Sequence, residues 1–247
     1  MLFASLRTLL FTAPFIIAST CVMGFISLVK SLWDKTGDKQ LAVARSWAKS
    51  LVFAMRIRVT IEGLENIDPN RNYIFVCNHL SYADTPVILS SIPVNFRFMA
   101  KKELFNIPFL GTHLRTAAHI PIDSANPREG IRSLSGGAKL IQERKMSVLI
   151  FPEGGRTEGK LEPFREGAAY LAIKSGTAVI PMALIGTREV LPMHSKVCRG
   201  GPVTLRIGEP ISTEGMVIRD RGALNESLHE RVAGLLLAGE KTYTQRL

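Results

Sequence analysis

The chain of 247 residues has only three cysteines, Cys21, Cys77 and Cys198, and they lie far apart in the sequence. An odd number of distant cysteines fits neither a disulfide framework nor a zinc site built from paired cysteines. The five histidines are scattered without the spacing of metal ligands. We therefore expect no metal site, and a globular part that faces a reducing, cytoplasmic environment.

Other absences narrow the functional classes. The chain has no Gly-x-Ser-x-Gly segment, which argues against a serine hydrolase. It has no internal repeat, and its length leaves little room for two full domains. Lys+Arg of 31 against Asp+Glu of 21 gives a net charge of +10, which favours anionic partners such as phospholipid headgroups or an acidic carrier protein. Because no nucleic-acid recognition motif accompanies this charge, we expect no nucleic-acid binding.

Charge is also absent from residues 8–29, a run of apolar residues bracketed by Arg7 and Lys30. The run is about as long as a helix needs to cross roughly 30 Å of hydrocarbon. A cleaved signal peptide is the alternative, but its apolar region is usually shorter. The sequence therefore predicts a retained membrane anchor.

A second helical pattern follows over residues 41–55, with apolar residues at intervals of three and four. Basic residues interrupt it, and Trp47 suits a membrane boundary, so the pattern favours an amphipathic helix on an anionic leaflet. An ordinary helix packed on the protein core is the alternative. Residues 1–56 together predict a membrane-anchoring helical hairpin, in which Pro14 permits a bend. The sequence leaves open whether the pair spans the bilayer or stays in one leaflet.

Residues 57–247 alternate between short β-rich runs and helical windows. The expected strands are 57–62, 73–77, 96–100, 119–122, 147–151, 179–185 and 203–207, and the expected helices are 84–90, 128–143, 165–175 and 223–237. This alternation predicts an α/β fold with a mixed, largely parallel sheet flanked by helices.

The first chemical motif lies in residues 78–84, directly after an expected strand. Its His79 and Asp84 would be rotated by about 140° on an uninterrupted helix, so they can meet only if His79 lies in the loop and the chain turns back. A carboxylate on one imidazole nitrogen leaves the other nitrogen free to act as a base. Asp84 as a helix-capping residue is the alternative interpretation. The nearby Cys77 is a possible nucleophile by type, but its apolar strand favours a small buried residue.

The second motif, residues 151–157, also follows an apolar strand and combines glycines with a fixed cation. Glycines let backbone amides approach a ligand, and the guanidinium of Arg156 can hold a phosphate through two hydrogen bonds. A charged turn in which Glu153 is the structural partner of Arg156 is the alternative.

These two motifs together resemble the glycerolipid acyltransferases typified by 1-acylglycerol-3-phosphate acyltransferase. Residues 78–84 are similar to the family's block of a His, four residues and an Asp, and residues 153–157 to its Glu-Gly-x-Arg-Ser/Thr block. Residues 120–123 and 179–183 resemble the two remaining blocks, so the resemblance extends from about residue 57 to residue 211. One departure is Ser124, where the family usually has an arginine.

The resemblance implies roles for individual residues. His79 and Asp84 are the expected catalytic pair, and the expected substrate-binding residues are Lys101, Glu153, Gly154, Gly155, Arg156 and Thr157. The cations Lys101 and Arg156 are expected to hold the acceptor phosphate. A solvent-exposed lysine at a strand end is the alternative for Lys101.

The resemblance also implies an activity. The expected reaction moves a fatty acyl group from acyl-CoA or acyl-acyl carrier protein to the free hydroxyl of 1-acylglycerol 3-phosphate, giving phosphatidic acid in phospholipid biosynthesis. It needs no cofactor beyond the acyl donor and takes place at the cell membrane, with the catalytic domain facing the cytoplasm. The alternatives are an acyltransferase acting on glycerol 3-phosphate or another lysolipid, and a non-catalytic membrane-binding protein.

Overall fold

The computed structural model describes residues 2–123, 126–157 and 159–244. Its centre is a seven-stranded sheet in the order β1-β7-β6-β2-β5-β3-β4, in which only β6 and β7 pair antiparallel. The strands are β1 (Ile57–Glu62), β2 (Ile74–Cys77), β3 (Phe96–Lys101), β4 (Ile120–Ile122), β5 (Ser147–Ile150), β6 (Val179–Ile185) and β7 (Gly201–Ile207). The predicted fold class is confirmed, and the predicted strands match with small shifts at their ends.

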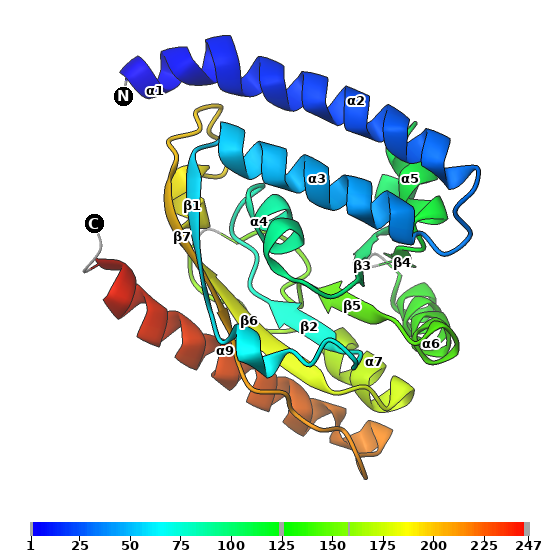
Figure 1. Ribbon diagram of the computed structural model, residues 1–247. Helices are drawn as coiled ribbons and strands as arrows, with labels where there is room; N and C mark the ends of the chain where they lie inside the picture. The colour runs from blue at the N-terminus through cyan, green and yellow to red at the C-terminus, as the bar shows by residue number, and fades with distance from the viewer. Residues whose placement is uncertain (1, 124–125, 158, 245–247) are drawn as a thin grey trace.

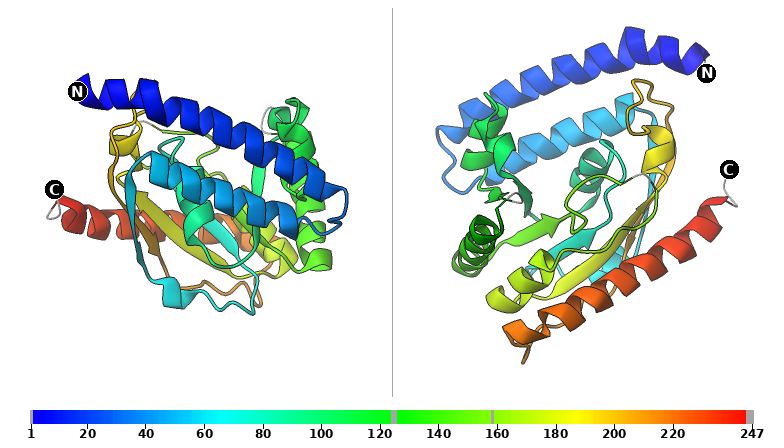
Figure 2. Two further views of the ribbon diagram at one scale, coloured as in Figure 1. Left: turned by 45° about the horizontal axis from the view of Figure 1, so that its top comes forward. Right: turned by 180° about the vertical axis from the view of Figure 1, so that it is seen from behind.

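Helices cover both faces of this sheet (Figures 1 and 2). The longer ones are α2 (Ala13–Ser31), α3 (Asp38–Ala54), α4 (Asp84–Ser91), α6 (Pro127–Arg144), α7 (Gly167–Ser175) and α9 (Arg221–Thr244). The short ones are α1 (Leu2–Arg7), α5 (Leu110–Thr116) and α8 (Thr187–Val190), with a π-helix η1 (Thr8–Thr12) and 3₁₀ turns η2 (Leu64–Asn66), η3 (Lys102–Asn106) and η4 (Ile218–Asp220). The sequence pattern does not predict α5 or α8.

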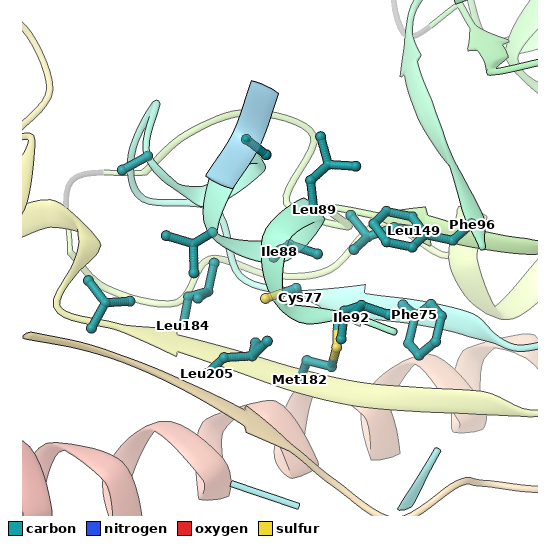
Figure 3. Packing of buried hydrophobic residues seen from close by; sticks show 14 of the residues in the cluster. Phe75, Cys77, Ile88, Leu89, Ile92, Phe96, Leu149, Met182, Leu184 and Leu205 are labelled. Atoms are coloured by element: carbon teal, nitrogen blue, oxygen red, sulfur yellow. The ribbon is translucent and has the colours of Figure 1, made fainter. Parts of the chain in front are cut away.

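The two faces of the sheet carry separate cores. On the central strand β2, Phe75 and Cys77 pack toward α3 and α4, whereas Ile74 and Val76 pack toward α6, α7 and α9. Figure 3 shows the first of these cores around Cys77 and Ile88. Because side chains alternate along a strand, a strand buried on both faces must be apolar at every position, which explains the continuous apolar runs in β2, β5 and β6.

Helix α3 belongs to this packed unit. Its Leu41, Ala48 and Leu51 are buried in the same core as α4 and the sheet. This burial confirms, for one face of α3, the alternative interpretation of a helix packed on the protein core, while Phe53 on the same helix is 82% exposed. The apolar stripe of α3 fits a neighbouring helix because both helices bury complementary faces.

Residues Leu2–Ser31 form one helical run that is long and apolar enough to cross a membrane by length and composition. The run contains the π-helix, in which the N–H of Ala13 donates to the carbonyl of Thr8. Pro14 follows and has no N–H to donate to the carbonyl of Leu10, so a wider turn accommodates the proline without breaking the helix.

This long helix lies along the globular part of the protein, beside α3 (Figure 1). A row of hydroxyl side chains faces the protein. Thr8 Oγ1 donates to the carbonyl of Cys198 at 3.2 Å, Ser19 Oγ lies 2.9 Å from Ser50 Oγ, and Ser27 Oγ lies 2.7 Å from His113 Nδ1. The opposite face exposes large apolar residues, among them Leu9, Phe11, Ile17, Val22 and Phe25. The helix is thus held against its own domain near both of its ends.

Asp34 holds the turn between α2 and α3. Its Oδ1 accepts hydrogen bonds from the backbone N–H groups of Thr36 and Gly37 and from the Thr36 hydroxyl, and its Oδ2 accepts from the N–H groups of Lys39 and Gln40. Burial raises the pKa of this carboxyl, but the hydrogen bonds outweigh it and lower the pKa to about 2. Asp34 therefore satisfies N–H groups that the start of α3 would otherwise leave unpaired.

We expect Asp34→Ala to lower the free energy of unfolding by about 2 kcal/mol, because several backbone donors lose their acceptor together. The stabilisation is present above the unfolded pKa of 3.8 and is lost as the pH falls through the folded pKa of about 2, so the difference between the two proteins should shrink over that range. Denaturant unfolding of the two detergent-solubilised proteins at several pH values measures this difference in the free energy of unfolding. Asp68→Ala is the control, because the carboxylate of the exposed Asp68 accepts a hydrogen bond from only one of the described residues, the N–H of Asn70; an equal loss in both variants would contradict the capping role.

Candidate active site

The two sequence motifs lie at the same edge of the sheet. The loop 78–83 follows β2, and the loop that begins at Phe151 follows β5. The strands β2 and β5 are parallel neighbours at the centre of the sheet, so both loops leave from their carboxyl ends. Ligand sites in α/β proteins gather at this edge.

His79 and Asp84 are in direct contact. The imidazole Nδ1 lies 2.8 Å from Asp84 Oδ2, and the same oxygen accepts the N–H groups of Leu80 and Ser81, each at 2.8 Å. Asp84 is fully buried and His79 is 8% exposed. The chain turns back between the two residues, as the spacing predicts.

This geometry indicates which nitrogen of the neutral imidazole bears the proton. A buried carboxylate is an acceptor, so Nδ1 carries the proton and Nε2 is left with its lone pair. Asp84 is also the first residue of α4, but its carboxylate binds groups that precede the helix and the histidine ring. It therefore orients His79 instead of serving only as a helix cap.

An aromatic ring fixes one face of the imidazole. Phe151 stacks on His79 with ring centroids 3.9 Å apart and an interplanar angle of 11°. Phe98 of β3 lies behind Phe151 at 6.5 Å. Together with Asp84, this stack leaves the imidazole one orientation, in which the ring edge bearing Nε2 points away from Asp84.

The second motif clamps the backbone of His79 from both sides. The N–H of His79 donates to Glu153 Oε1 at 2.7 Å, and its carbonyl accepts the N–H of Thr157 at 2.9 Å. Glu153 Oε2 accepts the N–H of Glu162 at 3.1 Å. Burial raises the pKa of Glu153, against the opposing effect of these two amides. In the described part of the chain Glu153 forms no ion pair with Arg156, so the interpretation of Glu153 as the partner of Arg156 is wrong.

The cation of the second motif rests on an aromatic ring. The Arg156 guanidinium lies 4.0 Å from the centroid of the Tyr82 ring, which comes from the first motif. Lys101 is exposed at the carboxyl end of β3, and its ammonium group makes no hydrogen bond or ion pair with the residues that the structure describes. Both cations are thus available to an anionic group at this edge of the sheet. Ser124 lies outside the described residues.

Some residues of the site carry no signal that sequence analysis uses. The side chain of Asn78 binds both the N–H of Leu184, at 2.8 Å, and its carbonyl, at 3.0 Å, so it extends the pairing of β2 with β6 by one residue. Tyr82 and Phe151 act through stacking. Residue type alone does not reveal Asn78, Tyr82 or Phe151, but each lies inside one of the two motifs, and this position could have marked them as site residues.

Cys77 is fully buried beneath the site, and burial raises the pKa of its thiol well above the usual value. A thiol held protonated is a poor nucleophile, so the structure favours the small buried residue over the nucleophile. Among the described residues, no three His, Cys, Asp or Glu side chains are grouped so that they could hold a metal ion.

Comparison with known proteins identifies the family. A family model described as "Acyltransferase" matches residues 58–185. The chain belongs to the acyltransferase family. Membership confirms the family and the enzyme class that the motifs predict.

Individual relatives agree with this assignment. The chain is 31% identical over 198 residues to a 1-acyl-sn-glycerol-3-phosphate acyltransferase of Cocos nucifera, covering 79% of this chain and 64% of that protein. It is 33% identical over 172 residues to the chloroplastic 1-acyl-sn-glycerol-3-phosphate acyltransferase LPAT1 of Arabidopsis thaliana, covering 68% and 48%. The chain thus spans between about half and two thirds of these proteins' lengths.

A solved structure matches over nearly the whole chain. The crystal structure of the 1-acyl-sn-glycerophosphate (LPA) acyltransferase PlsC from Thermotoga maritima has a TM-score of 0.78 and 27% identity, and the match covers 94% of this chain and 96% of that one. The likeness therefore includes the N-terminal helices as well as the sheet.

We expect Gly154→Ala to destabilise the acyltransferase by about 1–2 kcal/mol and to reduce its activity. Gly154 has a φ of +77°, and an added Cβ would lie 2.7 Å from Arg165 Nε. Gly155→Ala is the matched control, since a Cβ there meets no atom within 4 Å. Thermal unfolding and activity of both variants test this, and similar behaviour of the two would show that the turn does not need its left-handed residue.

Proposed function

We propose that this protein transfers a fatty acyl group from acyl-CoA or acyl-acyl carrier protein to the free hydroxyl of 1-acylglycerol 3-phosphate, forming phosphatidic acid. The observation that carries the proposal is the buried contact between His79 and Asp84, clamped by the loop of Glu153 and Thr157. The relatives, which are named as 1-acylglycerol-3-phosphate acyltransferases, support the acceptor.

In the proposed reaction, Nε2 of His79 takes the proton of the acceptor hydroxyl while the oxygen attacks the thioester carbonyl. The carbon–sulfur bond then breaks, and the imidazolium returns the proton to the departing thiolate. Asp84 stabilises the imidazolium that forms between these steps. General-base catalysis of this kind contributes about 10²–10⁴ in rate. No step requires a covalent acyl-enzyme or a cofactor.

When the acceptor oxygen attacks, negative charge develops on the thioester carbonyl oxygen, and hydrogen-bond donors are needed to stabilise it. The backbone N–H groups of Gly155 and Arg156 lie in the loop clamped to His79, and they have no acceptor within the described residues. We assign them as donors to the oxyanion. Glu153 fits a positioning role better than substrate contact, because its oxygens are engaged and its negative charge would repel a phosphate.

The guanidinium of Arg156 and the ammonium of Lys101 are assigned to the acceptor phosphate. The ring of Tyr82 supports Arg156 from below and limits the conformations that it must give up on binding. When the phosphate is held in place, the free hydroxyl of the same acceptor is oriented toward the thioester carbonyl, so binding of the phosphate favours the reaction. The apolar face of the N-terminal helix would keep the enzyme at the cell membrane, on its cytoplasmic side.

We expect His79→Ala and Asp84→Asn each to lower kcat by about 10²–10⁴ while the protein stays folded. The measurement is an assay of the purified enzyme with labelled lysophosphatidate, glycerol 3-phosphate and lysophosphatidylcholine, each with acyl-CoA and acyl-acyl carrier protein. His229→Gln on α9 is the control, since that histidine packs against Phe164 on the other face of the sheet. Unchanged turnover in the His79 variant would exclude the base. Faster acylation of glycerol 3-phosphate than of lysophosphatidate would overturn the acceptor but not the chemistry.

We expect Arg156→Gln to raise KM for the phosphate-bearing acceptor by about tenfold to a hundredfold, with a smaller change in kcat, because a charge-assisted hydrogen bond is lost. Tyr82→Phe is the control, since it keeps the ring beneath the guanidinium. Steady-state kinetics at varied acceptor and fixed donor separate the two parameters. An Arg156 variant that raises KM for the acyl donor alone would assign this cation to the other substrate.

A further inference from the structure

Large apolar side chains are exposed around α5 and the turn that follows α2. Trp33 is 70% exposed and Phe109 is 76% exposed, and Leu32, Ile107 and Leu110 are also solvent-exposed. Neither the sheet nor the proposed active site uses these side chains. Exposed aromatic and aliphatic side chains grouped in this way mark a contact surface.

The two segments form one rigid unit. Ser27 of α2 binds His113 of α5 at 2.7 Å between Oγ and Nδ1. In the turn, Gly37 has a φ of +83°, and a Cβ there would lie 2.8 Å from the carbonyl oxygen of Ala117, which follows α5. The turn and α5 therefore pack backbone to backbone, and Figure 1 shows α5 beside the carboxyl end of α2.

Cations surround the same place. A surface depression of about 450 Å³ is lined by Lys35, Lys102, Arg115 and Arg144, with no Asp or Glu in its lining. Lys102 also lies 3.4 Å from Asp123. Lys35 and Arg144 extend into an adjoining depression that adds further basic residues, Arg71, Arg97 and Lys145, and one acidic residue, Asp38.

Phe109 holds its exposed position in an unusual backbone conformation. Its φ is +64°, in the left-handed region that a residue with a Cβ rarely adopts. The next turn of chain is tight as well, because Gly111 sits against the carbonyl of Phe105 with no room for a Cβ. The loop is thus built to direct an aromatic side chain outward.

We propose that Trp33, Ile107, Phe109 and Leu110, with the cations Lys35, Lys102, Arg115 and Arg144, form a second bilayer contact, which we call the α5 surface. The apolar side chains enter the lipid interface, and the cations bind anionic phospholipid headgroups. A soluble acidic partner would account for the cations but not for the apolar side chains beside them. The surface also continues the apolar face of α2, which supports a bilayer as the occupant.

The location has a consequence for the enzyme. Strand β3 ends at Lys101, and the chain enters η3 and the α5 surface at the next residue. Lys102 therefore places one part of the α5 surface at the sheet edge at which His79 is found, whereas Lys35 and Arg144 lie toward the opposite edge, beside residues that precede β2 and β5. Together with the N-terminal helix, the α5 surface fixes the rotation of the domain about that helix.

A site-specific probe tests the contact even though the N-terminal helix alone should hold the protein on vesicles. In a Cys21→Ser background, which removes the exposed cysteine, Leu110→Cys carries an environment-sensitive fluorophore. Vesicles of phosphatidylcholine and phosphatidylglycerol with a nitroxide-labelled lipid should quench it. The control label is Glu214→Cys, in the exposed connection after β7, where Met216 packs on the α9 side. Quenching no stronger at 110 than at 214 overturns the proposal.

The charged part has its own test. We expect Lys35→Gln with Arg144→Gln to weaken binding to vesicles containing phosphatidylglycerol by about fivefold for each charge removed, and to leave binding to phosphatidylcholine vesicles unchanged. Lys174→Gln with Arg219→Gln removes the same charge from exposed positions on α7 and η4, on the other face of the sheet. Equal weakening by both double variants would show a general effect of net charge and overturn the proposed surface.

Discussion

The site depends on one buried carboxylate. Asp84 has no exposure to solvent, and a charge in such a place is tolerated only when hydrogen bonds replace the water that it has lost. One of its oxygens accepts three N–H donors, from the His79 ring and from the backbone of Leu80 and Ser81. These bonds fold the loop 78–83 back on itself, orient the imidazole and place the start of α4. The direction of Nε2 follows from them.

The rest of the site is assembled on the backbone of His79. Asn78 ties it to β6 through Leu184, and Glu153 and Thr157 tie it to the loop after β5. Three neighbouring strands thus hold one residue, and they do so mainly through main-chain groups, whose positions vary little. Side-chain freedom is left to the two cations that we assign to the acceptor phosphate, Arg156 and Lys101. This division suits a reaction in which the base must be fixed and the lipid must enter and leave.

How much of this the sequence predicts depends on the range of each interaction. Local patterns are readable in the sequence. Apolar runs predict the strands, and the spacing of five residues shows that His79 and Asp84 can meet only if the chain turns back between them. The hydrogen bond from Asn78 to Leu184 and the contact of the Arg156 guanidinium with the Tyr82 ring join residues far apart in the chain, so no local pattern reveals them. The cap at Asp34 is local, but it acts through backbone N–H groups two to six residues away and resembles any polar turn.

Helix α3 shows a different limit. Its pattern correctly predicts a helix with one apolar face. Periodicity indicates that such a face is buried, but it does not indicate whether the partner is lipid or protein. Lipid and a neighbouring helix are equally apolar partners for Leu41 and Leu51, and here the partner is the core with α4. Large apolar side chains remain exposed on the outer face of the long N-terminal helix and on α3 itself, where Phe53 is 82% exposed. Helix α3 lies between the N-terminal helix and the sheet. The carboxyl end of β3, where Lys101 leads into η3 and α5, lies at the same edge of the sheet as the loop that carries His79, because β2, β5 and β3 are parallel neighbours, so the order of the strands brings Lys101 and the two motifs to one end of the sheet.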